Sequence, residues 1–309
     1  MKPIRIAIIG FGKIAADQHV PAIAANPRLD LVATSSRSGQ GAGQQFTDWR
    51  ELIRSVDGLE AVAITTPPAP RYEIARECVL AGLHCLLEKP PTATLAEVHD
   101  LACLAEAEQV TLQATWHARH HPAVDAAAQA LAGKRIASLQ LTWHEDVRKW
   151  HPGQKWIWDP AGFGVFDPGI NAFSIATRIF PGSLFVRDAR LSIPQNSQTP
   201  VAADITFASP EADGPLNASL DWRKSEGEEW TIAVTTADGL QLRLEGGGRT
   251  LILNGEAREL PELGEYPGIY ADFVDLIDER RSDVDVTPFR LVADCLMIGE
   301  RHAVEAVVN

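Results

Sequence analysis

The chain has 309 residues, which is long enough for two domains of ordinary size, each with its own hydrophobic core. Apolar residues make up 45% of it and charged residues 22%, a composition that excludes an extended disordered protein. The formal net charge of −13 argues against nucleic acid or an anionic membrane surface as a partner, because both are polyanions. We therefore expect no nucleic-acid partner and no membrane partner.

The cysteines and the start of the chain indicate the compartment. Cys78, Cys85, Cys103 and Cys295 show neither CxxC nor metal-ligand spacing, so we expect reduced thiols. No signal peptide is recognisable ahead of the first apolar run, and the apolar runs are far shorter than a membrane span. We expect a cytoplasmic protein.

The first part of the chain, residues 1–120, alternates short apolar runs with amphipathic stretches. The apolar runs predict buried strands at Ile4–Ile9, Leu29–Ala33, Ala61–Thr65, Leu83–Leu87 and Val110–Ala114. Apolar residues at three- and four-residue spacing predict helices between them, such as Arg71–Ala81 and Leu95–Ala107. This alternation is typical of an α/β fold with a doubly wound parallel sheet, a Rossmann-type domain.

The second part, residues 121–309, has a different pattern. After a helix over Pro122–Leu131, two-residue alternation predicts strands at Ser138–Thr142, Ala202–Phe207, Asn217–Trp222, Thr231–Thr235, Leu240–Leu244 and Thr250–Leu253. Turn residues separate these runs, which indicates an antiparallel sheet. Two further helices are expected near Tyr266–Glu279 and Pro288–Val307, so the second domain is predicted to be α+β.

A glycine turn follows the first predicted strand. Gly10 and Gly12, with Ala15 three residues later, stand where a strand gives way to a helix. Glycines allow the backbone to approach a pyrophosphate closely, and the helix N-terminus offers free N–H donors. The turn therefore predicts a dinucleotide site, and the alternative is a glycine turn without a ligand.

The end of the second strand bears on the choice of cofactor. NAD-specific sites usually place Asp or Glu there, whereas this strand ends in Ser35, Ser36 and Arg37, and Asp30 lies at its other end. A hydroxyl and a guanidinium are suited to a ribose phosphate. We predict that NADP is preferred and NAD is also accepted. The alternative is that Arg37 is a solvated loop charge in an NAD enzyme.

A lysine stands at the carboxyl end of the fourth predicted strand, within Glu88–Lys89–Pro90. This is the edge at which open α/β sheets bind ligands. A lysine there favours negative charge developing on a substrate oxygen. A cis peptide bond before Pro90 is a further expectation, and a surface ion pair of Glu88 with Lys89 is the alternative.

A carboxylate and an amide stand four residues apart at a predicted helix start. Asp167 and Asn171 follow the glycine-rich segment that begins at Gly162, so on a helix they share one face. Asp167 is the candidate base, and the alternative is that it only caps the helix.

Residues 143–158 combine indole rings with hydrogen-bonding groups, because four of the eight tryptophans fall there. Such a surface suits a neutral sugar, which has apolar faces and a rim of hydroxyls. Acids at Glu145 and Asp146 argue against an anionic sugar. We expect His117, Trp150 and His151 to contact the sugar, although packing of the tryptophans in the core is the alternative. No two nearby histidines form a helical pair with an acidic partner, so we expect no metal site.

On these residues the chain resembles, over essentially its whole length, the glucose-fructose oxidoreductase/inositol dehydrogenase/MocA (Gfo/Idh/MocA) family of NAD(P)-dependent enzymes. The motifs that carry the resemblance are Gly10/Gly12/Ala15, Thr66–Pro67–Pro68, Glu88–Lys89–Pro90 and Gly164–Val165 with Asp167 and Asn171. The resemblance implies a Rossmann domain followed by a large open antiparallel sheet whose outer face forms dimers or tetramers. Within the family, the chain is most similar to sugar 1-dehydrogenases acting on L-arabinose and D-galactose.

The expected contacts to the cofactor come from Gly10, Phe11, Gly12, Lys13, Ile14, Ser36, Arg37, Thr65, Thr66, Pro67, Glu88 and Lys89. The expected contacts to the substrate come from Lys89, His117, Trp150, His151, Asp167 and Asn171.

Two positions depart from the family pattern. Asn171 stands where the family usually has a histidine, which puts an aspartate–histidine pair at this position in doubt. Arg71–Tyr72 stands where a histidine often follows the Thr–Pro motif.

The predicted reaction is oxidation of the anomeric hydroxyl of a neutral sugar to an aldonolactone. Asp167 is the expected base, Lys89 polarises the oxygen and Asn171 orients it, while Lys89 as the base remains an alternative. Oxidation of a cyclitol and a non-catalytic NADP-binding regulator are the competing functions.

Overall fold

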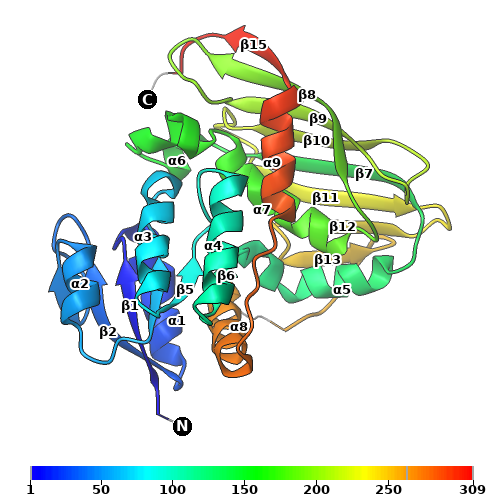
Figure 1. Cartoon of the computed structure of the whole chain (residues 1–309). Coiled ribbons are helices and arrows are strands. Elements are labelled where there is room, and N and C mark those ends of the chain that lie inside the picture. The colour runs from blue at the N-terminus through cyan, green and yellow to red at the C-terminus, as the bar shows by residue number, and fades with distance from the viewer. Residues whose placement is uncertain (1, 262–263, 308–309) are drawn as a thin grey trace. The chain divides into compact units, whose positions relative to one another are not determined.

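The structure, a computed structural model, describes residues 2–261 and 264–307. The chain forms two compact units, each with its own sheet and core. The first comprises 1–117 and 264–286, and the second comprises 118–263 and 287–309. Figure 1 shows the elements of both units in the colours of the chain order.

The first unit contains a parallel sheet with the strand order β3-β2-β1-β4-β5-β6 among the described residues. Its strands are β1 Ile4–Ile9, β2 Leu29–Ser35, β3 Gln44–Phe46, β4 Ala61–Ile64, β5 His84–Leu87 and β6 Leu112–Ala114. The predicted parallel sheet is confirmed, and the short polar edge strand β3 was not foreseen. The order changes direction between β1 and β4, which is the switch point where open α/β sheets bind ligands.

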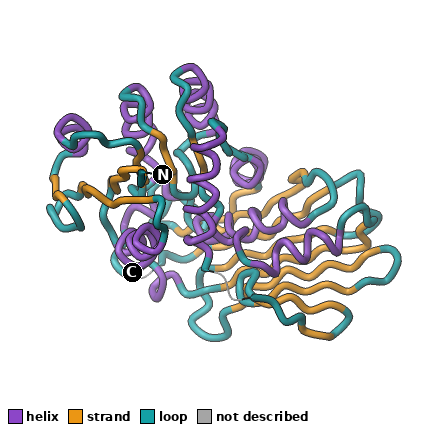
Figure 2. Tube along the Cα trace, turned by 90° about the horizontal axis from the view of Figure 1, so that it is seen from below, coloured by secondary structure: helices purple, strands orange, loops and turns teal. Residues whose placement is uncertain are grey.

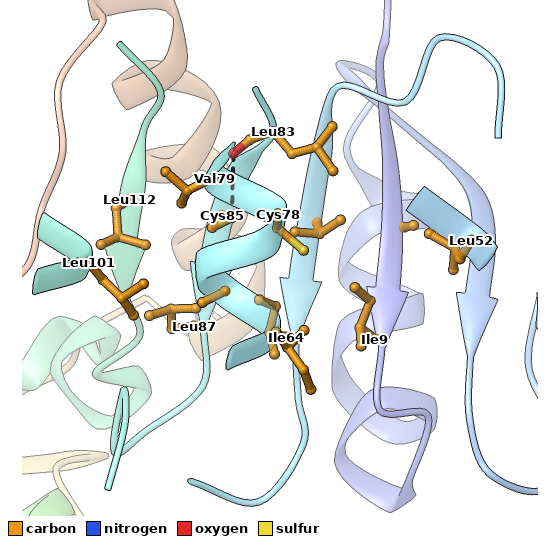
Figure 3. Close-up of a cluster of buried hydrophobic side chains, with 14 of the residues drawn as sticks. Ile9, Leu52, Ile64, Cys78, Val79, Leu83, Cys85, Leu87, Leu101 and Leu112 are labelled. Atoms are coloured by element: carbon orange, nitrogen blue, oxygen red, sulfur yellow. Dashed lines mark hydrogen bonds between the residues drawn. The ribbon is translucent and has the colours of Figure 1, made fainter. Parts of the chain in front are cut away.

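Helices cover both faces of this sheet. They are α1 Val20–Ala25, α2 Trp49–Ser55, α3 Pro68–Leu80, α4 Leu95–Ala107 and α8 Glu265–Glu279. Figure 3 shows the core in which Leu52 of α2, Cys78 of α3 and Leu101 of α4 pack against the strands. Cys78 and Cys85 of this unit are buried free thiols, and Cys103 is an exposed free thiol. Cys295, which belongs to the second unit, is also a buried free thiol.

The opposite face is closed by α1 and by α8, which comes from late in the chain. Tyr270 and Phe273 of α8 are fully buried against Ile6 and Ile8 of β1. After α8 the chain runs beside β6, where the N–H of Ala114 donates to the carbonyl of Asp283 at 2.9 Å. Residues 264–286 therefore pack with the first unit, whereas the predicted boundary at residue 120 had assigned them to the second domain. A single domain boundary along the sequence cannot describe a later segment that packs with the first domain.

The second unit is built on one large sheet, in which the described strands follow the order β14-β13-β12-β11-β7-β10-β9-β8-β15. The strands are β7 Ile136–His144, β8 Phe185–Pro194, β9 Ala202–Ala208, β10 Leu216–Asp221, β11 Glu229–Thr236, β12 Gln241–Glu245, β13 Thr250–Leu253, β14 Glu256–Ala257 and β15 Glu300–Val304. The pairs are antiparallel except for β7–β10 and β8–β15, which are parallel. The predicted large antiparallel sheet is confirmed, with these two pairs as the exceptions, because long connections allow a strand to return in the same direction.

Helices α5 Pro122–Leu131, α7 Phe166–Ile179 and α9 Thr287–Ile298 pack on one face of this sheet, as Figure 2 shows. The unit also contains the short helix α6 Val147–Trp150. The helix predicted over Pro288–Val307 is wrong in its second half, because α9 ends at Ile298 and β15 begins at Glu300. None of the helices within 2–261 and 264–307 is long and apolar enough to cross a membrane.

Candidate active site

The glycine turn is held between the carboxyl ends of β2 and β4. The N–H groups of Gly10 and Phe11 both donate to the carbonyl of Ser35, at 2.8 and 3.1 Å. The Thr65 hydroxyl donates to the carbonyl of Gly10 at 2.6 Å. Gly10 has a φ of +99°, and a Cβ there would lie 2.7 Å from the backbone nitrogen of Thr66. Only glycine therefore fits at this crossing of two loops.

Gly12, unlike Gly10, has no close neighbours on the side where a Cβ would lie. A Cβ at Gly12 would meet no heavy atom within 4 Å, so the backbone there borders open space. The helical turn Ala15–His19 follows directly, and the first N–H groups of a helix have no intrahelical acceptor. Lys13 and Ile14 are exposed beside it. Such a cradle at a helix N-terminus suits the pyrophosphate of a dinucleotide.

The loop after β4 contributes Thr66 and Pro67. Pro67 is exposed and precedes α3, whereas the Thr66 hydroxyl is buried without a hydrogen-bond partner among the described residues. An unsatisfied buried hydroxyl beside the glycine turn is a second feature that a polar ligand would complete.

At the end of β2, Ser36 and Arg37 have different roles. The Ser36 hydroxyl is buried and donates to the carbonyl of Gln40 at 2.8 Å, so it holds the turn that follows the strand. Arg37 is exposed, and its guanidinium makes no ion pair with the described residues. Asp30, at the other end of the strand, pairs with Arg5 at 3.7 Å. The guanidinium of Arg37 is therefore available to an anionic ligand.

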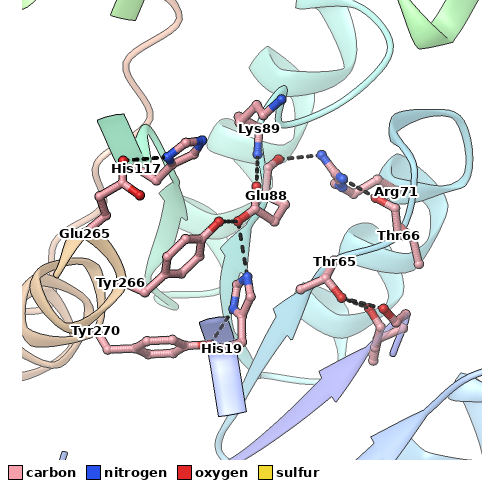
Figure 4. A network of polar contacts seen from close by, with 12 residues as sticks. His19, Thr65, Thr66, Arg71, Glu88, Lys89, His117, Glu265, Tyr266 and Tyr270 are labelled. Atoms are coloured by element: carbon pink, nitrogen blue, oxygen red, sulfur yellow. Dashed lines mark hydrogen bonds and ion pairs between the residues drawn. The ribbon is translucent and has the colours of Figure 1, made fainter. Parts of the chain in front are cut away.

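A buried polar network surrounds Glu88, as Figure 4 shows. Its Oε1 lies 3.1 Å from Nε2 of His19 and accepts from the Tyr266 hydroxyl at 2.7 Å. Its Oε2 accepts from the backbone N–H of Lys89 at 2.9 Å. The other ring nitrogen of His19 lies 2.7 Å from the Tyr270 hydroxyl. Glu88 is thus not part of a surface ion pair, and that alternative is wrong.

The network changes the acidity of its members. Burial by itself would raise the pKa of Glu88, but the hydrogen bond and positive charge of His19, the charge of His117 and the Tyr266 hydroxyl outweigh it and hold the pKa well below its usual range. Burial, and then the negative charge of Glu88, raises the pKa of both Tyr266 and Tyr270. We infer that Glu88 is ionised at neutral pH and that both phenols are protonated.

Arg71 fixes the backbone on both sides of Lys89. Its buried guanidinium donates to the carbonyls of Glu88, Pro90 and Thr66. The Lys89–Pro90 peptide bond is cis, as expected from the sequence. Lys89 is therefore carried on a segment that is hydrogen-bonded at the residues before and after it.

His117 borders the same network in the first unit. Its ring stacks on Tyr266 with centroids 5.9 Å apart, and its Nδ1 lies 3.1 Å from Oε1 of Glu265. His117 therefore stacks on the same tyrosine whose hydroxyl donates to Glu88 (Figure 4).

In the second unit, Asp167 lies in the first turn of α7. The residue that caps α7 is Val165, and Asp167 lies inside the helix, so the capping alternative is wrong. The Asp167 side chain is buried, and its Oδ2 lies 3.4 Å from Nε2 of His151. Asn171 follows one turn later and is half-buried. The helix therefore places the carboxylate and the amide on one face.

The start of α7 lies directly on the sheet. A Cβ at Gly169 would lie 2.6 Å from Cδ1 of Leu220, so glycine allows the helix to pack against β10. His151 follows α6, and its ring packs against Trp222, with centroids 5.3 Å apart. Leu220 and Trp222 lie at the carboxyl end of the same strand. Asp167 and His151 therefore meet above the end of β10.

Trp150 is exposed at the edge of this surface. Its indole N–H donates to Glu228 at 2.6 Å, and its ring meets Trp230 edge to face, with centroids 5.4 Å apart. The hydrogen bond fixes the orientation of a ring that is 45% exposed. Such a held and accessible indole is suited to contact an apolar sugar face.

Glu145 is a further candidate to which the sequence analysis gave no contact role. Its buried carboxylate accepts from the indole N–H groups of Trp222 and Trp230, both at 3.0 Å. The available signal was an acid directly after an alternating strand and among several tryptophans. Asp146, in contrast, caps α6 and pairs with Arg148.

Comparison with known proteins identifies the family. A profile described as "Oxidoreductase family, NAD-binding Rossmann fold" (GFO_IDH_MocA) matches residues 4–116. Galactose 1-dehydrogenase from Pseudomonas fluorescens is 43% identical over 307 residues, which cover 99% of each chain. The chain belongs to the Gfo/Idh/MocA oxidoreductase family.

Two solved structures are similar to this chain over almost its whole length. The crystal structure of D-galactose-1-dehydrogenase from Rhizobium etli has a TM-score of 0.94 and 46% identity, and covers 100% of this chain and 99% of its own. A 3-ketoreductase variant from Actinomadura kijaniata, crystallised with TDP-benzene and NADP, has a TM-score of 0.86 at 16% identity, with coverage of 98% and 100%. The second likeness concerns the fold alone.

The two units of this family member divide the predicted site residues between them. The first unit contains the glycine turn, Ser36, Arg37, Thr65, Thr66, Pro67, Glu88, Lys89 and His117, and the second contains Trp150, His151, Asp167 and Asn171. No group of three or more His, Cys, Asp or Glu side chains within the described ranges is arranged to hold a metal ion.

Proposed function

We propose that the protein is an NAD(P)-dependent aldose 1-dehydrogenase that oxidises the anomeric hydroxyl of D-galactose and L-arabinose to the aldonolactone, with NADP preferred. The observation that carries this proposal is the buried carboxylate of Asp167, which is paired with His151 and followed by Asn171 on one helix face. The likeness to two galactose 1-dehydrogenases over the whole chain supports the same substrate class.

The structure has features that fit a nicotinamide dinucleotide. Gly12 borders open space at a helix N-terminus, and the buried Thr66 hydroxyl lacks a partner among the described side chains. We propose that Gly10–Ile14 hold the pyrophosphate and that Thr65, Thr66 and Pro67 lie along the cofactor with Glu88 and Lys89. When bound, the nicotinamide supplies the hydride acceptor.

NADP is proposed as the preferred form because of the end of β2. No acidic side chain follows Ser35, and the Arg37 guanidinium is exposed without an ion pair among the residues described. A guanidinium can bind a 2′-phosphate bidentately, whereas the ribose hydroxyls of NAD would find no carboxylate there. The Ser36 hydroxyl is bonded within its own turn, so we expect it mainly to orient Arg37.

The proposed role of each side chain in the reaction follows from its charge and its hydrogen-bonding groups. Asp167 accepts the proton of the anomeric hydroxyl while the C1–H bond gives up its hydride and a C1=O bond forms. Lys89 places a positive charge against the oxygen, and Asn171 orients the hydroxyl. A positioned base contributes about 10²–10⁴ in rate. Trp150, His151 and His117 are the proposed sugar contacts. Glu145 holds Trp222 and Trp230, whose rings pack against His151 and Trp150.

The chain is further proposed to form homodimers or tetramers through the open face of the large sheet. That face carries a hollow lined by charged and polar side chains of both signs, including Asp188, Arg190, Asp204 and Asn217. A surface with both signs of charge can pair with a second copy of itself about a twofold axis. Sedimentation velocity of the protein and of the Arg190→Glu variant tests this, because a sheet interface predicts a lower molar mass for the variant.

Initial rates of nicotinamide reduction test the function. D-galactose, L-arabinose, a cyclitol and a sugar phosphate are each compared with NADP and with NAD. The proposal predicts turnover of the neutral aldoses, faster with NADP, and a loss of at least about a hundredfold in kcat for Asp167→Asn. Turnover of the cyclitol alone, or near-full activity of the variant, would contradict it.

A further inference from the structure

The carboxyl group of Asp167 lies where water reaches it little. Its side chain is only 6% exposed, and the short connection before α7 keeps it against the sheet. A buried carboxylate needs a hydrogen-bonding or charged partner, because burial otherwise disfavours its ionised form. One such group, contributed by another element of this unit, is the imidazole of His151, whose Nε2 lies 3.4 Å from Oδ2 of Asp167.

The His151 ring is held so that one nitrogen faces Asp167. Nδ1 lies 3.4 Å from Oε1 of Gln154, and that amide oxygen also accepts from the Trp156 indole N–H at 3.0 Å. The indole is a donor only, so it fixes which end of the amide faces the histidine. Trp222 packs against the ring from another side. Both nitrogens of His151 therefore face acceptor oxygens, so a proton on Nε2 can be donated towards Asp167.

We propose that His151 is the positioning residue of Asp167, which it orients through Nε2–H for proton transfer from the sugar. This inference rests on the proposed function and adds a role for His151 beyond contact with the sugar. The present separation of 3.4 Å is long for a hydrogen bond, and catalytic hydrogen bonds in unliganded enzymes commonly shorten when substrate binds. The proposal makes Asp167 and His151 one functional pair assembled from α7 and from the segment after α6.

A double-mutant cycle tests this pairing. We compare wild type, His151→Phe, Asp167→Asn and the double variant for kcat and for the aldose KM. Loss of a hydrogen bond to the base predicts a fall of about tenfold to a hundredfold in kcat for His151→Phe, larger than the rise in KM that the lost sugar contact causes. In the Asp167→Asn background the same change is expected to cost less than about twofold, because residues that act as a unit are non-additive.

Two further variants separate positioning from packing. His151→Gln keeps an N–H donor near the place of Nε2, so it should recover much of the lost kcat, whereas Phe retains the ring without a donor. His99→Gln, on the exposed face of α4, is the matched control and should leave both constants unchanged. Additive effects in the cycle, or a higher KM with unchanged kcat, would overturn the proposal.

A measurement that does not depend on turnover distinguishes failure of the His151–Asp167 pairing from failure of the proposed function. In protein labelled with ¹⁵N-histidine, Asp167→Asn should shift the Nε2 resonance of His151 and leave that of His99 in place. An unchanged His151 resonance would overturn the pairing even in an active enzyme. Absence of turnover on every aldose, with the shift observed, would instead contradict the proposed function and support the pairing.

Discussion

His19 and Glu88 form a buried pair in the first unit, with 3.1 Å between imidazole Nε2 and carboxylate Oε1. The histidine belongs to the helical turn after the glycine turn, whereas the glutamate precedes Lys89. The segment that follows the glycine turn and the segment that carries the lysine are therefore joined through two side chains.

This pair predicts how stability depends on pH. The pKa of Glu88 in the folded chain lies below its usual value of 4.5, so the ionised carboxylate stabilises the fold above that pH. The contribution declines as the pH falls from about 4.5 towards the folded-state pKa. We expect Glu88→Gln to lower the free energy of unfolding at pH 7 by about 1.5–3 kcal/mol, since a hydrogen bond to a charged group is lost.

Urea unfolding between pH 3 and pH 7 measures this effect. The stability of Glu88→Gln should change less with pH than that of wild type. Glu106→Gln, which alters an exposed glutamate of α4, is the matched control. Parallel pH curves for wild type and Glu88→Gln would show that the pair does not contribute.

Substitutions at the two glycines of the N-terminal turn are predicted to have different effects on stability and on cofactor binding. Gly10→Ala places a Cβ at a φ of +99° and 2.7 Å from the backbone of Thr66, so it should destabilise the fold by more than about 1 kcal/mol. Gly12→Ala fills open space, so stability should stay within about 1 kcal/mol while NADP binding is lost. Thermal unfolding and a fluorescence titration with NADPH distinguish these outcomes, and equal NADPH affinity of Gly12→Ala and wild type would contradict the second.

Arg37→Ala tests the cofactor preference. Loss of a charge-assisted contact to phosphate predicts a rise of about tenfold to a hundredfold in the KM for NADP. The KM for NAD should change little, because NAD has no phosphate at that position. Steady-state kinetics with both cofactors give the answer, and an equal rise in the two constants would exclude the assignment. Arg76→Ala on α3 is a suitable control, since it removes one positive charge elsewhere in the first unit.

Glu145→Gln tests the buried acceptor between two indoles. An amide retains only one acceptor oxygen, so one of the Trp222 and Trp230 N–H groups loses its partner. A lost hydrogen bond to a charged group predicts destabilisation by about 1.5–3 kcal/mol and a higher aldose KM. Tryptophan emission and sugar kinetics measure both effects, and Glu229→Gln on the exposed side of β11 is the control. Emission and KM equal to those of wild type would exclude a role for the carboxylate.

Sequence periodicity predicts the helices and strands whose apolar residues recur on one buried face. Helix α4 begins and ends at the predicted residues, because Thr94 and Glu97 form a capping box at its start. The predicted strands of both sheets lie within a few residues of observed strands, whereas β3, β8, β14 and β15 were not predicted. The strand β15 was missed because it is a half-exposed edge strand that follows a helix after a single glycine. The sequence of α8 likewise gives no local indication that this helix packs with the first unit.

The site was predictable to the extent that its residues lie within motifs. Lys89, Asp167 and the glycine turn were selected from spacing alone, and the structure places each at the predicted end of a strand or helix. The contacts made by His19, Arg71 and Glu145 join segments far apart in the chain, as does the approach of His151 to Asp167. Such contacts depend on tertiary packing, so a single sequence does not specify them.

The late return of α8 constrains how this protein is made. Until the ribosome has released residues 264–286, one face of the nucleotide-binding sheet lacks the helix that buries Ile6 and Ile8. A nascent chain ending near residue 120 therefore exposes an apolar surface, and the glycine turn lacks the support of Tyr270 behind His19. The N-terminal domain, although first to be synthesised, is completed only when nearly the whole chain is available.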